Sequence, residues 1–140
     1  MKRTKLNIRG IGEVSVLKDE IQKTLRQIAI ARDGGCILRN IRHCYNGPKA
    51  VFQFDHLITR ANAATFADSR LGVCVCRGCH LWKEYHKEQY DALVKTLLPK
   101  DRVELWEKCE KDSWNPVRTT AMDWKLSLIL LEKELESYAH

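Results

Sequence analysis

Two stretches of the chain decide its fold: residues 50–60 read AVFQFDHLITR, and residues 71–83 read LGVCVCRGCHLWK. The β-branched and aromatic residues that end at Asp55 and His56 predict a strand over residues 50–56. Residues 71–76 predict a second short strand, and a helical pattern begins at His80. The sequence therefore predicts two strands followed by a helix, with a polar loop over residues 60–70 between the strands.

Helices are expected on both sides of this unit. Apolar residues recur at helical spacing over residues 16–32, where Ser15 is the expected N-cap and Gly34-Gly35 ends the pattern. On the other side, the helix from His80 is expected to end before Pro99.

Two more helices are expected near the C-terminus. One covers residues 100–111, and the other runs from a capping box formed by Thr120 and Asp123 to about Tyr138. The expected fold class is α+β, with a basic arm over residues 1–14 and one domain over residues 15–140. Within that domain we expect a zinc-stabilised finger at about 33–98 and C-terminal helices at about 100–138.

Composition favours a small basic protein. The chain has 140 residues, 44% of them hydrophobic, which is enough for one core, and its net charge of +6 favours a polyanionic partner without identifying one. No apolar run is long enough to span a membrane, and the first residues do not resemble a signal peptide, so we expect a cytoplasmic protein. Because the cytoplasm keeps thiols reduced, the six cysteines favour metal ligation or buried thiols over disulfides.

Four cysteines form the candidate zinc site. Cys76 and Cys79 have the usual Cys-x-x-Cys spacing, whereas Cys36 and Cys44 form a wider pair, and structural Zn²⁺ takes four such ligands. Cys74 points to the same face of its strand as Cys76 and is an alternative ligand, but the spacing favours Cys76. The competing interpretation is a group of buried thiols without metal, which is also the interpretation for Cys109.

A second group of residues has the chemistry of a catalytic centre. Asp55 offers hard oxygen ligands for Mg²⁺ or Mn²⁺, and His56 can act as a general base because an imidazole titrates near neutral pH. His80 is the expected second ligand of the catalytic ion, although it can also serve as a fourth zinc ligand. His86 lies about 240° around a helix from His80, so the two are not expected to converge.

The segment Asp55–Lys83 resembles the HNH endonucleases, also called His-Me finger or ββα-metal nucleases. The match is fullest at residues 76–83, CRGCHLWK. Residues 56–60 (HLITR), 66–70 (FADSR) and 76–79 (CRGC) are similar to the phage Rap/NinG recombination nucleases, and the likeness covers roughly residues 28–137. It implies a divalent-metal-dependent DNA endonuclease of phage or prophage origin that acts in recombination on branched DNA, such as a Holliday junction.

The resemblance also suggests partners. Basic residues near the motif are expected to contact DNA phosphates: Arg39, Arg42, Arg60, Arg70 and Lys83. The amphipathic helix over residues 121–138 is compatible with a homodimer.

Two features of the sequence depart from the family pattern. Leu71 stands where the family has an asparagine, although Asn62 offers another amide in the loop, and Cys36 and Cys44 replace a tight pair of cysteines. The alternative function is therefore a zinc-stabilised DNA-binding module that is catalytically weak or inactive.

Overall fold

The computed structural model describes residues 13–42, 44, 49–60, 62–112 and 119–139. These residues form an α+β fold with five α-helices and one two-stranded antiparallel sheet. In chain order the elements are α1 (Val14–Asp33), β1 (Phe52–His56), the 3₁₀ turn η1 (Ser69–Leu71), β2 (Gly72–Cys76), α2 (Arg77–Tyr85), α3 (Lys87–Leu97), α4 (Lys100–Asp112) and α5 (Ala121–Glu136). None of the described helices is long and apolar enough to cross a membrane.

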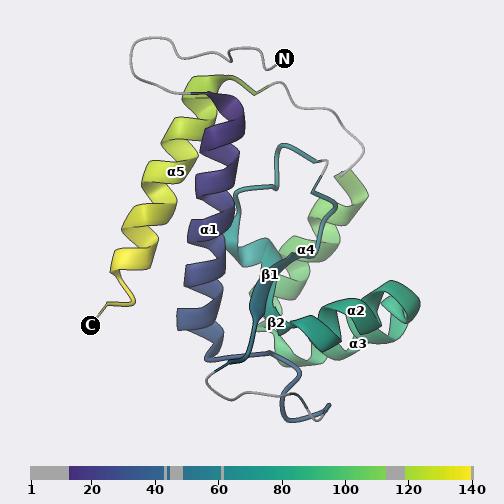
Figure 1. The fold of residues 1–140 in the computed structure, drawn as a ribbon. Helices are drawn as coiled ribbons and strands as arrows, with labels where there is room; N and C mark the ends of the chain where they lie inside the picture. The colour runs from purple at the N-terminus through teal and green to yellow at the C-terminus, as the bar shows by residue number, and fades with distance from the viewer. Residues whose placement is uncertain (1–12, 43, 45–48, 61, 113–118, 140) are drawn as a thin grey trace, which may run out of the picture.

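Helix α1 lies between α5 and the sheet (Figure 1). The two helices run side by side in the same direction, and their facing apolar stripes form one core cluster with Phe66 from the loop between the strands. The stripe of α1 consists of Leu17, Ile21, Leu25 and Ile28, and that of α5 of Trp124, Leu128 and Leu131. The expected capping box is confirmed, because the Thr120 hydroxyl accepts from the Asp123 N–H while the Asp123 carboxylate accepts from the Thr120 N–H.

A second core cluster lies on the other side of the sheet. Strand β2 is buried along its whole length, and its valines pack with residues of α3 and α4. The largest members of this cluster are Tyr90 and Trp106, both fully buried. Because β1 pairs antiparallel with β2, Asp55 lies opposite Val73 and His56 lies opposite Gly72 at the end of the sheet.

The expected continuous helix over residues 80–98 is wrong. The helix begins earlier, at Arg77, and is interrupted at His86, whose φ of −141° and ψ of 45° are not helical. The break separates α2 from α3, with Tyr85 77% exposed at the end of α2 and Tyr90 buried on α3.

The start of α1 also differs from the expectation. The helix begins at Val14, and Ser15 is its second residue rather than its N-cap. At the other end, Gly34 adopts a positive φ of 74° and its N–H donates to the Ile30 carbonyl, which ends the helix. This left-handed conformation suits glycine, and the resulting turn leads the chain into Cys36.

Candidate functional site

Four thiols converge where the loop after α1 meets the end of β2. The Sγ atoms of Cys36, Cys44, Cys76 and Cys79 all lie within 4.8 Å of one another. The Sγ of Cys44 is 3.3 Å from that of Cys79 and 3.6 Å from that of Cys36. A tetrahedral Zn²⁺ with Zn–S bonds of about 2.3 Å separates its sulfurs by about 3.8 Å. These four cysteines can therefore hold a metal ion such as zinc with small displacements.

A helix cap and a tertiary hydrogen bond position the two cysteine pairs. Cys76 is the N-cap of α2, and its Sγ accepts a hydrogen bond from the Cys79 N–H at 3.4 Å. The other pair is Cys36 and Cys44. Next to Cys36, the Ile37 N–H donates to the Cys74 carbonyl at 2.8 Å and fixes the loop that carries Cys36 against β2. The wide spacing between Cys36 and Cys44 is thus compatible with a compact cluster.

The thiols of this cluster differ in acidity. Burial raises the pKa of Cys44 to about 11 and also raises the pKa of Cys79. Burial acts in the same direction on Cys76, but hydrogen bonds from the Cys79 N–H and the neighbouring thiols outweigh it and lower the pKa of Cys76. A metal ion therefore has to displace protons from at least Cys44 and Cys79 when it binds near neutral pH.

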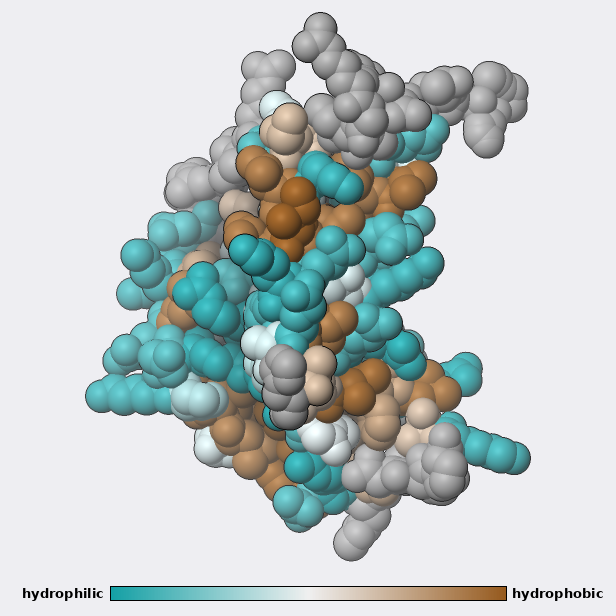
Figure 2. Space-filling view, turned by 90° about the vertical axis from the view of Figure 1, so that its left-hand side faces the viewer, coloured by the Kyte–Doolittle hydropathy of each residue, from teal (hydrophilic) through white to brown (hydrophobic). Residues whose placement is uncertain are grey.

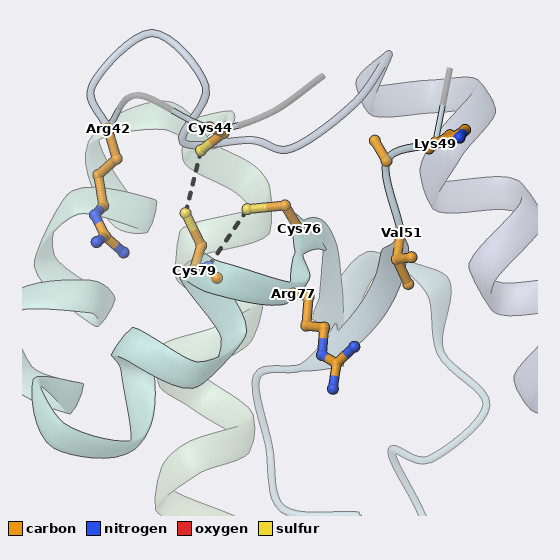
Figure 3. Close-up of a pocket in the computed structure, with 9 residues that line it drawn as sticks. Arg42, Cys44, Lys49, Val51, Cys76, Arg77 and Cys79 are labelled. Atoms are coloured by element: carbon orange, nitrogen blue, oxygen red, sulfur yellow. Dashed lines mark hydrogen bonds between the residues drawn. The ribbon is translucent and has the colours of Figure 1, made fainter. Parts of the chain in front are cut away.

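Basic residues surround the thiols. Arg42, Lys49 and Arg77 border a cavity of about 280 Å³ next to Cys44, Cys76 and Cys79, as Figure 3 shows. The guanidinium of Arg42 lies 4.4 Å from the centroid of the Trp82 ring. Zn²⁺ with four thiolates has a net charge of −2, which nearby cations stabilise.

The other two cysteines lie outside the cluster. Cys74 is fully buried, its backbone N–H donates to the Asp33 carboxylate, and burial raises the pKa of its thiol to about 12. Cys109 is half-buried on α4 and packs against the second core cluster. All six thiols are free of disulfides. The choice of Cys76 over Cys74 agrees with the geometry of the cluster.

A separate cavity of about 460 Å³ contains the candidate catalytic residues. It is bordered by Asp55 and His56 at the end of β1, by His80 and Lys83 of α2, and by Arg60 of the following loop. His86 lies outside this cavity and stacks on Trp82, with 5.0 Å between ring centroids. The fold therefore brings Asp55, His56 and His80 to one place.

Asp55 is buried and has three partners. Its Oδ1 lies 3.4 Å from the His80 Nε2, its oxygens accept from the Lys83 ammonium at 2.9 and 2.8 Å, and its Oδ2 accepts from the Tyr90 hydroxyl at 2.6 Å. Burial opposes ionisation of Asp55, but His80 and Lys83 outweigh it and the pKa of Asp55 falls below its ordinary value. The same contact raises the pKa of His80. Asp55 is thus a carboxylate held in a fixed orientation.

His56 points to the other side of the strand, as expected for a neighbour of Asp55. Its ring lies 4.8 Å from the Phe54 centroid and 5.0 Å from the Phe66 centroid, and its Nε2 is 3.0 Å from the Phe66 carbonyl oxygen. A carbonyl oxygen only accepts, so Nε2 carries the proton and Nδ1 keeps a lone pair. Burial lowers the pKa of His56, which favours the neutral base at pH 7.

Neither Leu71, at the position of the family's asparagine, nor Asn62, the other amide considered, reaches this cavity. Leu71 is 1% exposed and belongs to the second core cluster. Asn62 is also buried, and its side-chain oxygen accepts from the Ala64 N–H within its own turn. Neither residue is among those that border the catalytic cavity.

The five basic residues expected to bind DNA have different surroundings. Arg60 and Lys83 border the catalytic cavity. Arg39 donates to the backbone carbonyls of Asp33 and Cys36, and Arg70 pairs with Asp68. Arg42 stacks on Trp82 beside the thiols. Of these five residues, therefore, only Arg60 and Lys83 lie next to the candidate catalytic residues.

Sequence reasoning missed Tyr90 as a residue of this site. It was expected only as an apolar position of a helix, yet its hydroxyl orients Asp55. Its residue type is the sequence signal that could have identified it, because a buried tyrosine needs a partner for its hydroxyl.

Comparison with known protein families, curated proteins and solved structures found no match to this chain. The function is therefore argued from the residues and their geometry.

Proposed function

We propose that this protein is a divalent-metal-dependent DNA endonuclease of the HNH type, with a structural zinc site next to its catalytic centre. The observation that carries the proposal is one cavity that joins a fixed carboxylate, Asp55, to two imidazoles, His56 and His80. The thiol cluster supports it, because Cys79 and His80 are neighbours at the start of α2.

In this proposal His56 is the general base. Its Nδ1 lone pair takes a proton from the attacking water, while the Phe66 carbonyl holds the Nε2 proton and fixes the ring. Lys83 provides positive charge beside the reacting phosphate. Tyr90 keeps Asp55 oriented from the side of the core.

Asp55 and His80 would hold the catalytic ion, which supplies charge stabilisation to the phosphate and the leaving oxygen when it is bound. Adjacent ligands of an octahedral Mg²⁺ are about 3.0 Å apart, and Asp55 Oδ1 and His80 Nε2 are 3.4 Å apart. Because Lys83 already contacts both Asp55 oxygens, the ion competes with this ammonium group. We therefore expect ion binding to depend on ligands that the substrate phosphate adds.

A nicking assay tests the proposal. Supercoiled plasmid and a synthetic four-way junction are incubated with Mg²⁺ or Mn²⁺ and with wild type, His56→Ala, His80→Ala or the matched control His86→Ala. Loss of a general base is expected to slow nicking by about 10²- to 10⁴-fold in His56→Ala, whereas His86→Ala keeps activity. Zinc content and circular dichroism check that each variant is folded.

The alternative function is a zinc-stabilised DNA-binding module without turnover. Burial of Leu71 favours it, because no amide from that position reaches the cavity. Wild type that binds the junction but nicks neither substrate would support this alternative.

Cleavage of the four-way junction in preference to a linear duplex would support branched DNA as the substrate, and phage recombination as the process.

We also propose that α5 pairs with α5 of a second copy. Met122, Leu126, Ile129 and Leu130 are all exposed, and Figure 2 shows apolar side chains gathered on this side of the molecule. A second copy that covers these residues removes them from water, and a symmetric pairing brings the same face of α5 from both copies together.

A further inference from the structure

A second cavity lies beside the catalytic cavity along α1. The first, of about 460 Å³, is bordered by Gln22, Lys23 and Arg26 of α1 as well as by the candidate catalytic residues. The second, of about 420 Å³, is bordered by Lys18 and again by Gln22. Arg60 also borders both cavities, so the two lie side by side along α1. We call this pair of cavities the α1 groove.

The wall that α1 gives to this groove is basic. Lys23 and Arg26 lie on the face of α1 that points away from its buried stripe, and Lys18 lies at the edge of that stripe, with Asp19 as an acidic residue of the same wall. Arg60 adds a further positive charge where the cavities join. Asp55 and Lys83 cancel each other's charge. The remaining cations therefore give the groove an excess of positive charge.

These cations are held in different ways. The Arg26 Nε donates to the Phe52 carbonyl at 2.7 Å, which fixes the guanidinium beside β1. The Lys18 ammonium lies 5.2 Å from the Phe66 centroid and 5.3 Å from the Trp124 centroid. Lys23 is 72% exposed and has only a 3.7 Å ion pair with Glu20. Fixed cations at both ends of the wall, with an exposed one between them, suit a ligand of repeating negative charge.

The length of the wall matches a short run of nucleotides. Lys18 and Arg26 are separated by about 12 Å along the helix axis, at about 1.5 Å per residue. One DNA strand advances about 3.4 Å per nucleotide along its axis, so this wall spans about three to four nucleotides.

We infer that the α1 groove holds the DNA strand that enters the catalytic cavity, with Lys18, Lys23 and Arg26 contacting the phosphates beside the scissile one. This inference rests on the proposed nuclease function and extends it to residues outside the HNH-like segment. These three residues position the strand and take no part in the chemistry. Their loss therefore raises KM for nicking and leaves kcat nearly unchanged.

Binding of a labelled four-way junction, measured by fluorescence anisotropy without divalent ion at several salt concentrations, tests the inference. The test variant combines Lys18→Gln, Lys23→Gln and Arg26→Gln. The matched control removes the same charge from exposed positions of α4 with Lys100→Gln, Lys108→Gln and Lys111→Gln. Each lost phosphate contact lowers the salt slope by about 0.9, so the α1 variant is expected to lose about 2 to 3 units of slope and, at about 0.1 M salt, about 10²- to 10³-fold in affinity.

The single variant Lys23→Gln guards against misfolding, because its side chain is exposed, and it is expected to lose about one unit of slope. If wild type nicks DNA and the α1 variants keep its slope and KM, the inference is overturned and the nuclease function stands. Equal losses in the α1 and α4 variants would also overturn it, since they would reflect net charge alone. Wild type that neither binds nor nicks DNA would overturn both.

Discussion

Removal of the metal from the thiol cluster is expected to destabilise the fold. The four Sγ atoms lie within 4.8 Å of one another, and a regular zinc site needs about 3.8 Å between sulfurs, so each thiol moves by about 1 Å or less on binding. The ion then joins the loop after α1 to the start of α2, two segments that are far apart in the sequence.

The size of the effect follows from mass action. A nanomolar dissociation constant corresponds to about 12 kcal/mol, inside the range of about 10–16 kcal/mol found for structural zinc peptides. At about 1 μM free zinc, such a site stabilises the folded state by about 4 kcal/mol. For a domain of this size, chelation should lower the Tm by about 8–16 °C.

The assay combines metal analysis with thermal unfolding. Protein purified without chelator should contain about one zinc ion per chain, and Cys36→Ser or Cys44→Ser should abolish it, since zinc in such sites takes four ligands. Cys74→Ala and Cys109→Ala are the matched controls, because both thiols lie outside the cluster. Metal-free wild type, or loss of zinc in Cys74→Ala but not in Cys44→Ser, would refute the reasoning.

Three further predictions concern single residues. Tyr90→Phe removes the hydrogen bond to the Asp55 carboxylate, so urea unfolding of the zinc-loaded protein should show a loss of about 1.5–3 kcal/mol; an unchanged midpoint would contradict the role of this hydroxyl. Gly72→Ala should destabilise by about 1–3 kcal/mol in the same assay, because its Cβ would lie 1.9 Å from the Phe54 ring, whereas Gly78→Ala, with its nearest atom at 4.0 Å, should lose less; similar losses would count against this packing. Leu130→Lys should shift the protein to monomer in gel filtration with light scattering, because the side chain is 66% exposed on the apolar face of α5; wild type that is already monomeric would exclude the α5 pairing.

Local patterns in the sequence predicted most of the secondary structure. The strand that ends at His56 and the capping box at Thr120 each depend on residues close in sequence, and each is confirmed. The apolar stripe of α1 is confirmed at Ile21, Leu25 and Ile28, but its first position is Leu17, because Val16 is exposed. The interruption at His86 was missed because the apolar pattern continues through it and no glycine or proline stands there. The hydrogen bond from Tyr90 to Asp55 was missed as well, because it joins residues 35 positions apart.

The same distinction applies to the candidate sites. Residue types and spacings in the sequence alone identified Cys36, Cys44, Cys76 and Cys79 as candidate zinc ligands, and Asp55 and His80 as candidate ligands of a catalytic ion. Only the tertiary structure decided that the wide pair of Cys36 and Cys44 meets Cys76 and Cys79, that Leu71 is buried in the core, and that α1 forms a wall of the catalytic cavity. The physical reason is that ligand chemistry depends on the side chain itself, whereas convergence depends on how distant segments pack.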